Sequence, residues 1–132
     1  MQERRSGPRE RRLLVVDDHP DFREMMWQWF TGLGFSVCAV GNGCDAVRVA
    51  PVMKPEVVLM DLAMPVMDGF EATRRLREQP DTSEVPILAV SATASSADRA
   101  RATACGASAF IPKPLDFDAL LEAVRRALRQ TH

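Results

Sequence analysis

The sequence has few cysteines and no long apolar run, and both absences exclude classes of protein. Cys38, Cys44 and Cys105 are odd in number and lack C-x-x-C spacing, so they indicate neither a disulfide framework nor a zinc site. No apolar stretch reaches the ~20 residues of a membrane span, and the N-terminus carries Arg and Glu where a signal peptide is apolar. We therefore expect a cytoplasmic protein in a reducing compartment, with no membrane partner.

The chain also lacks an excess of charge of either sign, and it is poor in lysine. A formal net charge of -1 provides no general attraction to nucleic acid, so no nucleic-acid partner is expected. Arg supplies 15 of the 17 basic side chains, which leaves Lys54 and Lys113 as the only lysines. A lysine among candidate functional residues is therefore informative.

What is present is the pattern of a single α/β domain. Residues 1–11 form a polar segment that predicts a flexible tail, and residues 12–132 are long enough for one core. Short apolar runs then alternate with helical patterns, which is typical of a doubly wound parallel sheet. The pattern predicts strands over 13–16, 35–40, 57–60, 85–90 and 107–111, and helices over 21–33, 44–49, 69–78, 96–105 and 116–129.

Two of the predicted helices have features that bear on function. In the helix over 21–33, an apolar stripe is expected to be buried, and it consists of Phe22, Met25, Met26, Trp29 and Leu33. Trp27 lies about 140° round the helix from Phe22, so it is expected to be exposed. We interpret Trp27 as a possible docking residue for a phosphorylated donor, with packing against a neighbouring helix as the alternative. The helix over 96–105 has few large apolar residues and is expected to be weakly anchored.

Polar residues follow the predicted strands at their carboxyl ends, where open α/β sheets bind ligands. Asp17 and Asp18 follow the first strand, Asp61 the third, Ser91 the fourth and Lys113 the fifth. Three converging carboxylates require a compensating cation, and their oxygen donors suit Mg²⁺. With one such ion and one lysine the site is balanced in charge, and a phosphoryl group would make it more negative.

Four segments, LLVVDDHP, VVLMDLAMPVMDG, ILAVSA and FIPKPL, resemble the signature segments of response-regulator receiver domains. The resemblance covers residues 12–130 and implies a flavodoxin-like strand order 2-1-3-4-5. It implies phosphorylation of Asp61 in two-component or phosphorelay signalling. The donor would be a sensor histidine kinase or a histidine phosphotransfer protein. A downstream protein would bind the face formed by the helix over 96–105, the last strand and the last helix.

The same resemblance implies the role of each site residue. Asp18 and Asp61 would bind Mg²⁺ directly, Asp17 partly through water, and the backbone carbonyl of Ala63 would complete the protein ligands. Ser91 resembles the switch hydroxyl, Phe110 the aromatic switch, Lys113 the cation that contacts the phosphoryl group, and Pro114 the cis-proline.

Other interpretations remain at this stage. A phosphohydrolase with an aspartyl nucleophile usually shows D-x-D, but Ala63 stands two residues after Asp61. A binding module with an inert site and a receiver excised from a hybrid kinase or larger regulator are further alternatives to a stand-alone, non-enzymatic receiver. Ala63 and Thr93 flank the site, and the apolar Ala63 favours a long phosphoryl lifetime. His19 is expected to be exposed and without a catalytic role.

Overall fold

A five-stranded parallel sheet forms the centre of the described part of the chain, residues 11–93 and 95–130 of the computed structural model. The strands are β2 (Arg11–Val16), β3 (Phe35–Val40), β4 (Val57–Asp61), β5 (Ile87–Ser91) and β6 (Ala109–Pro112). Their spatial order is β3-β2-β4-β5-β6, which confirms the expected order 2-1-3-4-5. The expected tail over residues 1–11 lies outside the described residues, except for Arg11, which begins β2.

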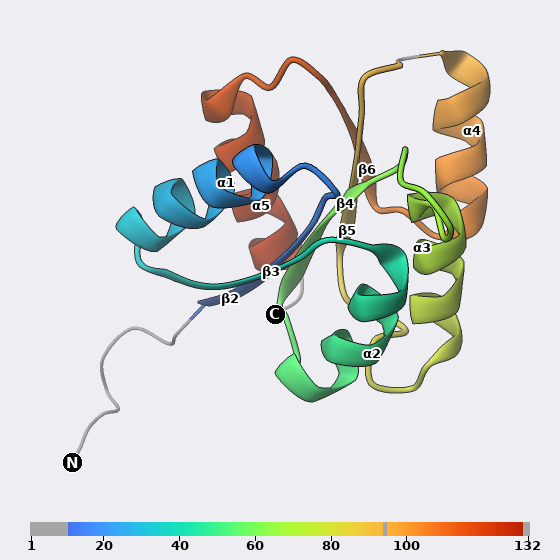
Figure 1. Ribbon diagram of the computed structural model, residues 1–132, viewed down its shortest axis with the longest axis horizontal. Helices are drawn as coiled ribbons and strands as arrows, with labels where there is room; N and C mark the ends of the chain where they lie inside the picture. The colour runs from blue at the N-terminus through green and yellow to red at the C-terminus, as the bar shows by residue number, and fades with distance from the viewer. Residues whose placement is uncertain (1–10, 94, 131–132) are drawn as a thin grey trace.

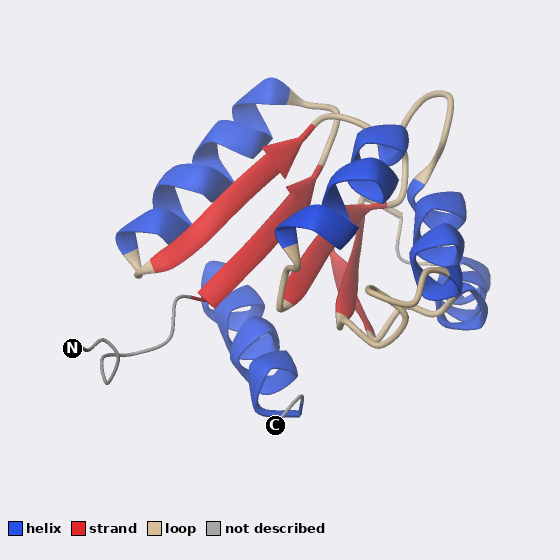
Figure 2. Ribbon diagram, turned by 90° about the horizontal axis from the view of Figure 1, so that it is seen from below, coloured by secondary structure: helices blue, strands red, loops and turns tan. Residues whose placement is uncertain are grey.

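Helices cover both faces of this sheet (Figures 1 and 2). They are α1 (Pro20–Gly32), α2 (Gly43–Met53), α3 (Gly69–Glu78), α4 (Ser96–Cys105) and α5 (Phe117–Gln130). The buried apolar residues of α1 and α5 belong to one core cluster, and Ala46 and Ala50 of α2 pack with Ala72 and Leu76 of α3 in a second. The doubly wound architecture predicted from the alternating pattern is therefore confirmed.

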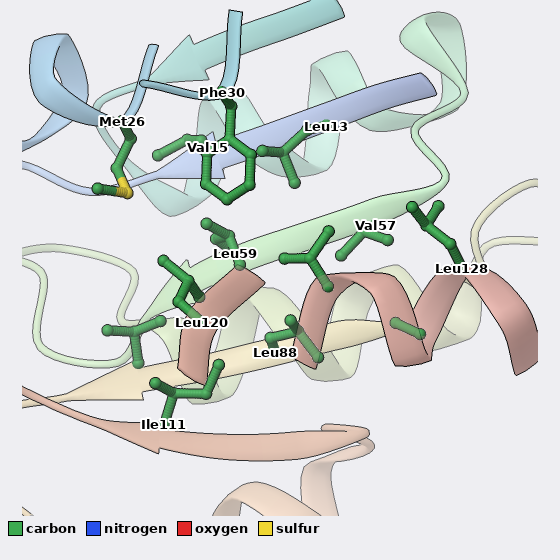
Figure 3. Packing of buried hydrophobic residues seen from close by; sticks show 13 residues of the cluster. Leu13, Val15, Met26, Phe30, Val57, Leu59, Leu88, Ile111, Leu120 and Leu128 are labelled. Atoms are coloured by element: carbon green, nitrogen blue, oxygen red, sulfur yellow. The ribbon is translucent and has the colours of Figure 1, made fainter. Parts of the chain in front are cut away.

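Successive residues of the central strands enter the two cores in turn. Leu13 and Val15 of β2 pack with α1 and α5, whereas Leu14 and Val16 pack with α2 and α3. All four are at most 1% exposed. Figure 3 shows the first of these cores, with Phe30 of α1 among strand side chains. Burial on both faces explains why the strands read as continuous apolar runs.

The buried stripe of α1 differs from the prediction. Met26 and Phe30 are fully buried, but Met25 is 43% exposed and Leu33 is 44% exposed, so their predicted burial was wrong. Met25 lies about 100° round the helix from Met26, beyond the face that meets the sheet. Leu33 is the residue after the helix, where the backbone leaves the helical path. Trp27 is 45% exposed, in agreement with the prediction.

Helix α2 continues beyond its predicted end at Val49 and includes Pro51. A proline within a helix has no N–H for the carbonyl four residues earlier, here that of Val47. The side chain of Gln79 donates a hydrogen bond to that carbonyl, at 3.3 Å. The residue that follows α3 thus satisfies the group that Pro51 leaves unpaired, and α2 ends at Met53, before Lys54, which has a left-handed conformation.

Candidate functional site

Residues from four neighbouring strands meet at one edge of the sheet. Asp17 and Asp18 directly follow β2, Asp61 ends β4, Ser91 ends β5, and Lys113 directly follows β6. Two backbone hydrogen bonds hold the segments that leave β2 and β6: Asp17 N donates to the Val40 carbonyl at 3.1 Å, and Lys113 N to the Ser91 carbonyl at 2.7 Å. Because all strands are parallel, their carboxyl ends share this edge, as the sequence predicts.

A lysine lies among the carboxylates. Lys113 Nζ is 3.2 Å from Asp17 Oδ2 and 3.9 Å from Asp61 Oδ1. Asp17 is fully buried and Asp61 is only 3% exposed, so water screens this cluster little. One ammonium group faces more than one carboxylate, which leaves negative charge uncompensated.

Two carboxylate oxygens show where further positive charge is needed. Asp18 Oδ1 and Asp61 Oδ2 are buried atoms to which no described residue donates a hydrogen bond. Buried carboxylate oxygens without a donor are costly, and a coordinated cation satisfies them. Asp17, Asp18, His19 and Asp61 each offer a ligand atom, and these atoms all lie within 4.8 Å of one another. The residues therefore fit a bound divalent ion.

The pKa of Asp61 reflects the same imbalance. Burial, followed by the nearby charge of Asp17, raises this pKa from 3.8 to about 6. The Lys113 ammonium and the hydrogen bond from Ala63 N to Asp61 Oδ1, at 3.3 Å, act in the opposite direction. Ionisation of this carboxyl is thus less favourable in the pocket than in water, and a cation would stabilise the ionised form.

The hydroxyl of Ser91 belongs to a hydrogen-bonded chain that leads to α4. Ser91 Oγ donates to the Thr93 carbonyl at 3.0 Å and lies 3.1 Å from Thr93 Oγ1. Thr93 Oγ1 donates in turn to Asp98 Oδ2 of α4, at 2.7 Å. A pocket of about 410 Å³ is lined by residues that include Ala63, Ser91, Thr93 and Asp98. Ser91 thus lies at the predicted edge, with its hydroxyl engaged by Thr93.

Phe110 also contacts α4. The Arg99 guanidinium lies over the half-buried Phe110 ring, 4.6 Å from the ring centroid. A cation–π contact can therefore hold this phenylalanine in place of the hydrogen bond that a tyrosine would make. Only Ala102 of α4 is buried, and the helix lies against α3 and β6.

Pro114 and His19 complete the surroundings of the site. The Lys113–Pro114 peptide bond is cis, as the resemblance implies for this position. His19 is exposed, as predicted, but its Nδ1 lies 2.9 Å from Asp17 Oδ1. Sequence reasoning gave His19 no part in the site, although its place directly after the Asp pair was the available signal.

The described helices include none that is both long enough and apolar enough to cross a membrane.

Comparisons with known proteins agree with this geometry. Residues 13–125 match the family model of the response regulator receiver domain. Protein PilH of Pseudomonas aeruginosa is 35% identical over 117 residues, which cover 89% of this chain and 97% of PilH. Regulatory protein AtoC of Escherichia coli is 36% identical over 118 residues, or 89% of this chain, but the matched region is only 25% of AtoC. The chain thus spans nearly all of one relative and a quarter of another.

Solved structures are similar over the whole fold. The chemotaxis protein CheY4 of Vibrio cholerae superposes with a TM-score of 0.87 at 29% identity, covering 91% of this chain and all of the other. The receiver domain of sensor histidine kinase PA1611 from Pseudomonas aeruginosa gives a TM-score of 0.84 at 32% identity, covering 91% and 98%. That structure contains a magnesium ion coordinated in its active-site cleft. The family match, the strand order and the acidic edge agree: this chain belongs to the response regulator receiver domains of two-component signalling.

Proposed function

We propose that Asp61 is the phosphoacceptor of this receiver and that its phosphorylation depends on Mg²⁺. The observation that carries the proposal is the buried Asp61 carboxylate, which lies 3.9 Å from the Lys113 ammonium and has one oxygen that accepts no hydrogen bond from the described residues. A carboxylate can attack phosphorus, and fixed cations stabilise the charge that develops on the transferred group. The chain thus acts as a phosphoacceptor signalling domain, which catalyses only its own phosphorylation and dephosphorylation.

The metal ligands we propose are Asp18 and Asp61 directly, Asp17 partly through water, and the backbone carbonyl of Ala63. The oxygen donor set supports the assignment, because Mg²⁺ prefers oxygen ligands and retains several waters. The ion would supply positive charge close to the phosphoryl oxygens.

In the proposed transfer, an Asp61 oxygen attacks the phosphorus of a phosphohistidine in line with the bond that breaks. The imidazole nitrogen of the donor leaves with the electron pair of the P–N bond, and Asp61 becomes an acyl phosphate. Lys113, already 3.2 Å from Asp17, would contact the new phosphoryl oxygens. The compact ammonium of lysine can bond to carboxylate oxygens and to phosphoryl oxygens.

Phosphorylation would reach the surface through Ser91 and Phe110. If the Ser91 hydroxyl turns to a phosphoryl oxygen, it gives up its hydrogen bond to Thr93. The series of hydrogen bonds from Ser91 through Thr93 to Asp98 of α4 is then broken at its first step. Phe110, held from outside by Arg99, would then move inward. The face formed by α4, β6 and α5 would change its shape, and a downstream protein would recognise that change.

We place the donor at α1 and the loop after β6. A mostly apolar pocket of about 430 Å³ lies beside Lys113 and is lined by residues that include Phe22, Met25 and Phe117. Trp27 is exposed on the same helix and lines a second pocket, on the side of α1 that faces β3. In this proposal a histidine kinase or phosphotransfer protein docks here, and Trp27→Ala weakens donor binding. An unchanged donor affinity and transfer rate would remove Trp27 from the interface.

The test of the proposed function uses acetyl phosphate as the phosphodonor and intact mass as the readout. We expect one phosphoryl adduct on the wild-type protein with Mg²⁺, and none with EDTA or on Asp61→Asn. The exposed Asp81→Asn is the matched control and should form the adduct. No adduct on the wild type would contradict the proposal, as would an adduct on Asp61→Asn. Slow loss of the adduct would support the expectation of a long lifetime based on Ala63.

A further inference from the structure

His19 is part of the acidic pocket rather than of the helix that it precedes. It is the N-cap residue of α1, yet its side chain makes no capping hydrogen bond. The ring instead turns back toward the carboxylates, with Nδ1 2.9 Å from Asp17 Oδ1 and 3.2 Å from Asp18 Oδ1. Its side chain is 66% exposed, so the ring can adjust without disturbing the core.

The spacing of these atoms matches that of ligands around one metal ion. With metal–ligand bonds of about 2.1 Å, adjacent ligands of an octahedral shell lie about 3.0 Å apart and opposite ones about 4.2 Å. His19 Nδ1 is hydrogen-bonded to Asp17 Oδ1 at 2.9 Å and lies 3.2 Å from Asp18 Oδ1, and both distances are also those of adjacent ligands in such a shell. The four candidate ligand atoms lie within 4.8 Å of one another, close to the widest separation in such a shell.

An independent observation shows that the pocket needs a ligand. Asp61 Oδ2 belongs to a side chain that is only 4% exposed, and no described residue donates a hydrogen bond to it. Lys113 approaches the other oxygen of Asp61, so it does not satisfy Oδ2. A cation that touches Asp61 Oδ2 and the carboxylates after β2 would have His19 Nδ1 beside it.

We propose that His19 is a nitrogen ligand that gives this pocket a preference for late first-row ions such as Ni²⁺ and Co²⁺ over Mg²⁺. Imidazole nitrogen suits these ions, whereas Mg²⁺ prefers oxygen. On metal binding, Nδ1 would give up to solvent the hydrogen that it donates to Asp17 Oδ1, and the neutral ring, with its remaining hydrogen on Nε2, would present a lone pair at Nδ1. The proposal rests on the proposed magnesium site, and it makes such ions competitors for the phosphorylation pocket.

Calorimetric titration with Ni²⁺ and with Mg²⁺, on the wild type and on His19→Ala, tests the proposal. Loss of a ligand should lower the ratio of Ni²⁺ to Mg²⁺ affinity at least about tenfold. His19 is exposed and its side chain makes no capping bond, so the variant should fold. In the Co²⁺-loaded wild type, a proton NMR spectrum should show a shifted, exchangeable imidazole N–H that His19→Ala lacks.

An unchanged affinity ratio, or a shifted N–H that persists in His19→Ala, would overturn the role of His19. In that case the ring acts only as a charged partner of Asp17 and Asp18. Asp61→Asn is the control for the pocket and should weaken binding of both ions. The proposed function is refuted by a different result, the absence of a magnesium-dependent adduct on Asp61. The failure of the His19 proposal can therefore be distinguished from the failure of the proposed function.

Discussion

Replacing Asp61, the proposed phosphoacceptor, should stabilise the metal-free protein. The pKa of Asp61 is raised from 3.8 to about 6, so the folded state binds this proton more tightly than the unfolded state does. Ionisation of the carboxyl therefore costs stability as the pH rises through the interval between the two values. That displacement corresponds to about 3 kcal/mol, and Asp61 is too deeply buried for solvent to reduce it much.

Asp61→Asn retains the shape of the neutral carboxyl and cannot ionise. In EDTA at pH 8 we expect its free energy of unfolding to exceed that of the wild type by about 3 kcal/mol. At pH 5 the difference should fall to about 1.5 kcal/mol, because most of the wild-type carboxyl is then protonated in the folded state. Urea denaturation across this pH range measures both values, with the exposed Asp81→Asn as the control.

Magnesium should reduce the difference between the two proteins. An ion at 100 times its dissociation constant stabilises the wild type by about 2.7 kcal/mol, and it should bind the Asn variant more weakly. The reasoning is refuted if Asp61→Asn is no more stable than the wild type at pH 8. A gain in stability that does not vary with pH would also refute it, because the gain would then have another cause than the carboxylate charge.

Three further substitutions test other parts of the structure. Lys113→Ala should slow phosphorylation by acetyl phosphate about 100-fold, because it removes the ammonium group that lies beside Asp17 and Asp61, and quenched time courses measure the rate. Arg99→Ala should remove the cation–π contact that holds Phe110, which is worth about 0.5–1 kcal/mol. The Phe110 ring should then move more often to its inward position, and NMR of the ring would detect this change. Gln79→Ala should destabilise the protein by about 1 kcal/mol in urea denaturation, because the Val47 carbonyl loses its donor.

Each of these predictions has a matched control. Lys113→Arg keeps the charge and should lose less activity than Lys113→Ala. Arg101→Ala removes a guanidinium from the Phe70 ring and should leave Phe110 unchanged. Pro51→Ala restores an N–H within α2, so Gln79→Ala should cost less in that background. The argument for Lys113 is contradicted if both lysine variants lose equal activity. The argument for Arg99 is contradicted if both arginine variants affect Phe110 equally. The argument for Gln79 is contradicted if Gln79→Ala costs the same stability with Pro51 and with Ala at position 51.

The sheet and the acidic edge were predictable because each depends on a repeating local pattern. Apolar strands that alternate with helices place the residues after each strand at one edge, and Asp17, Asp61 and Lys113 meet there. The extension of α2 was not predictable, because its donor Gln79 lies 32 residues from Val47. Local patterns cannot show such a bond.

The same limit applies to the finer details of the site. The sequence predicts that His19 is exposed, but the direction of its ring depends on Asp17, which the fold positions. The chain from Ser91 through Thr93 to Asp98 depends on how α4 is placed beside β5. Met25 and Leu33 fit an apolar period, yet only the docked helix decides which residues meet the sheet.

The most direct test of the central claim is to locate the phosphoryl group on the chain. After phosphorylation with Mg²⁺, borohydride reduction of the acyl phosphate and peptide mass analysis would identify the modified residue. We predict homoserine in place of aspartate at position 61, and unmodified aspartate at positions 17 and 18. Modification at position 17 or 18, or at no aspartate, would contradict the account.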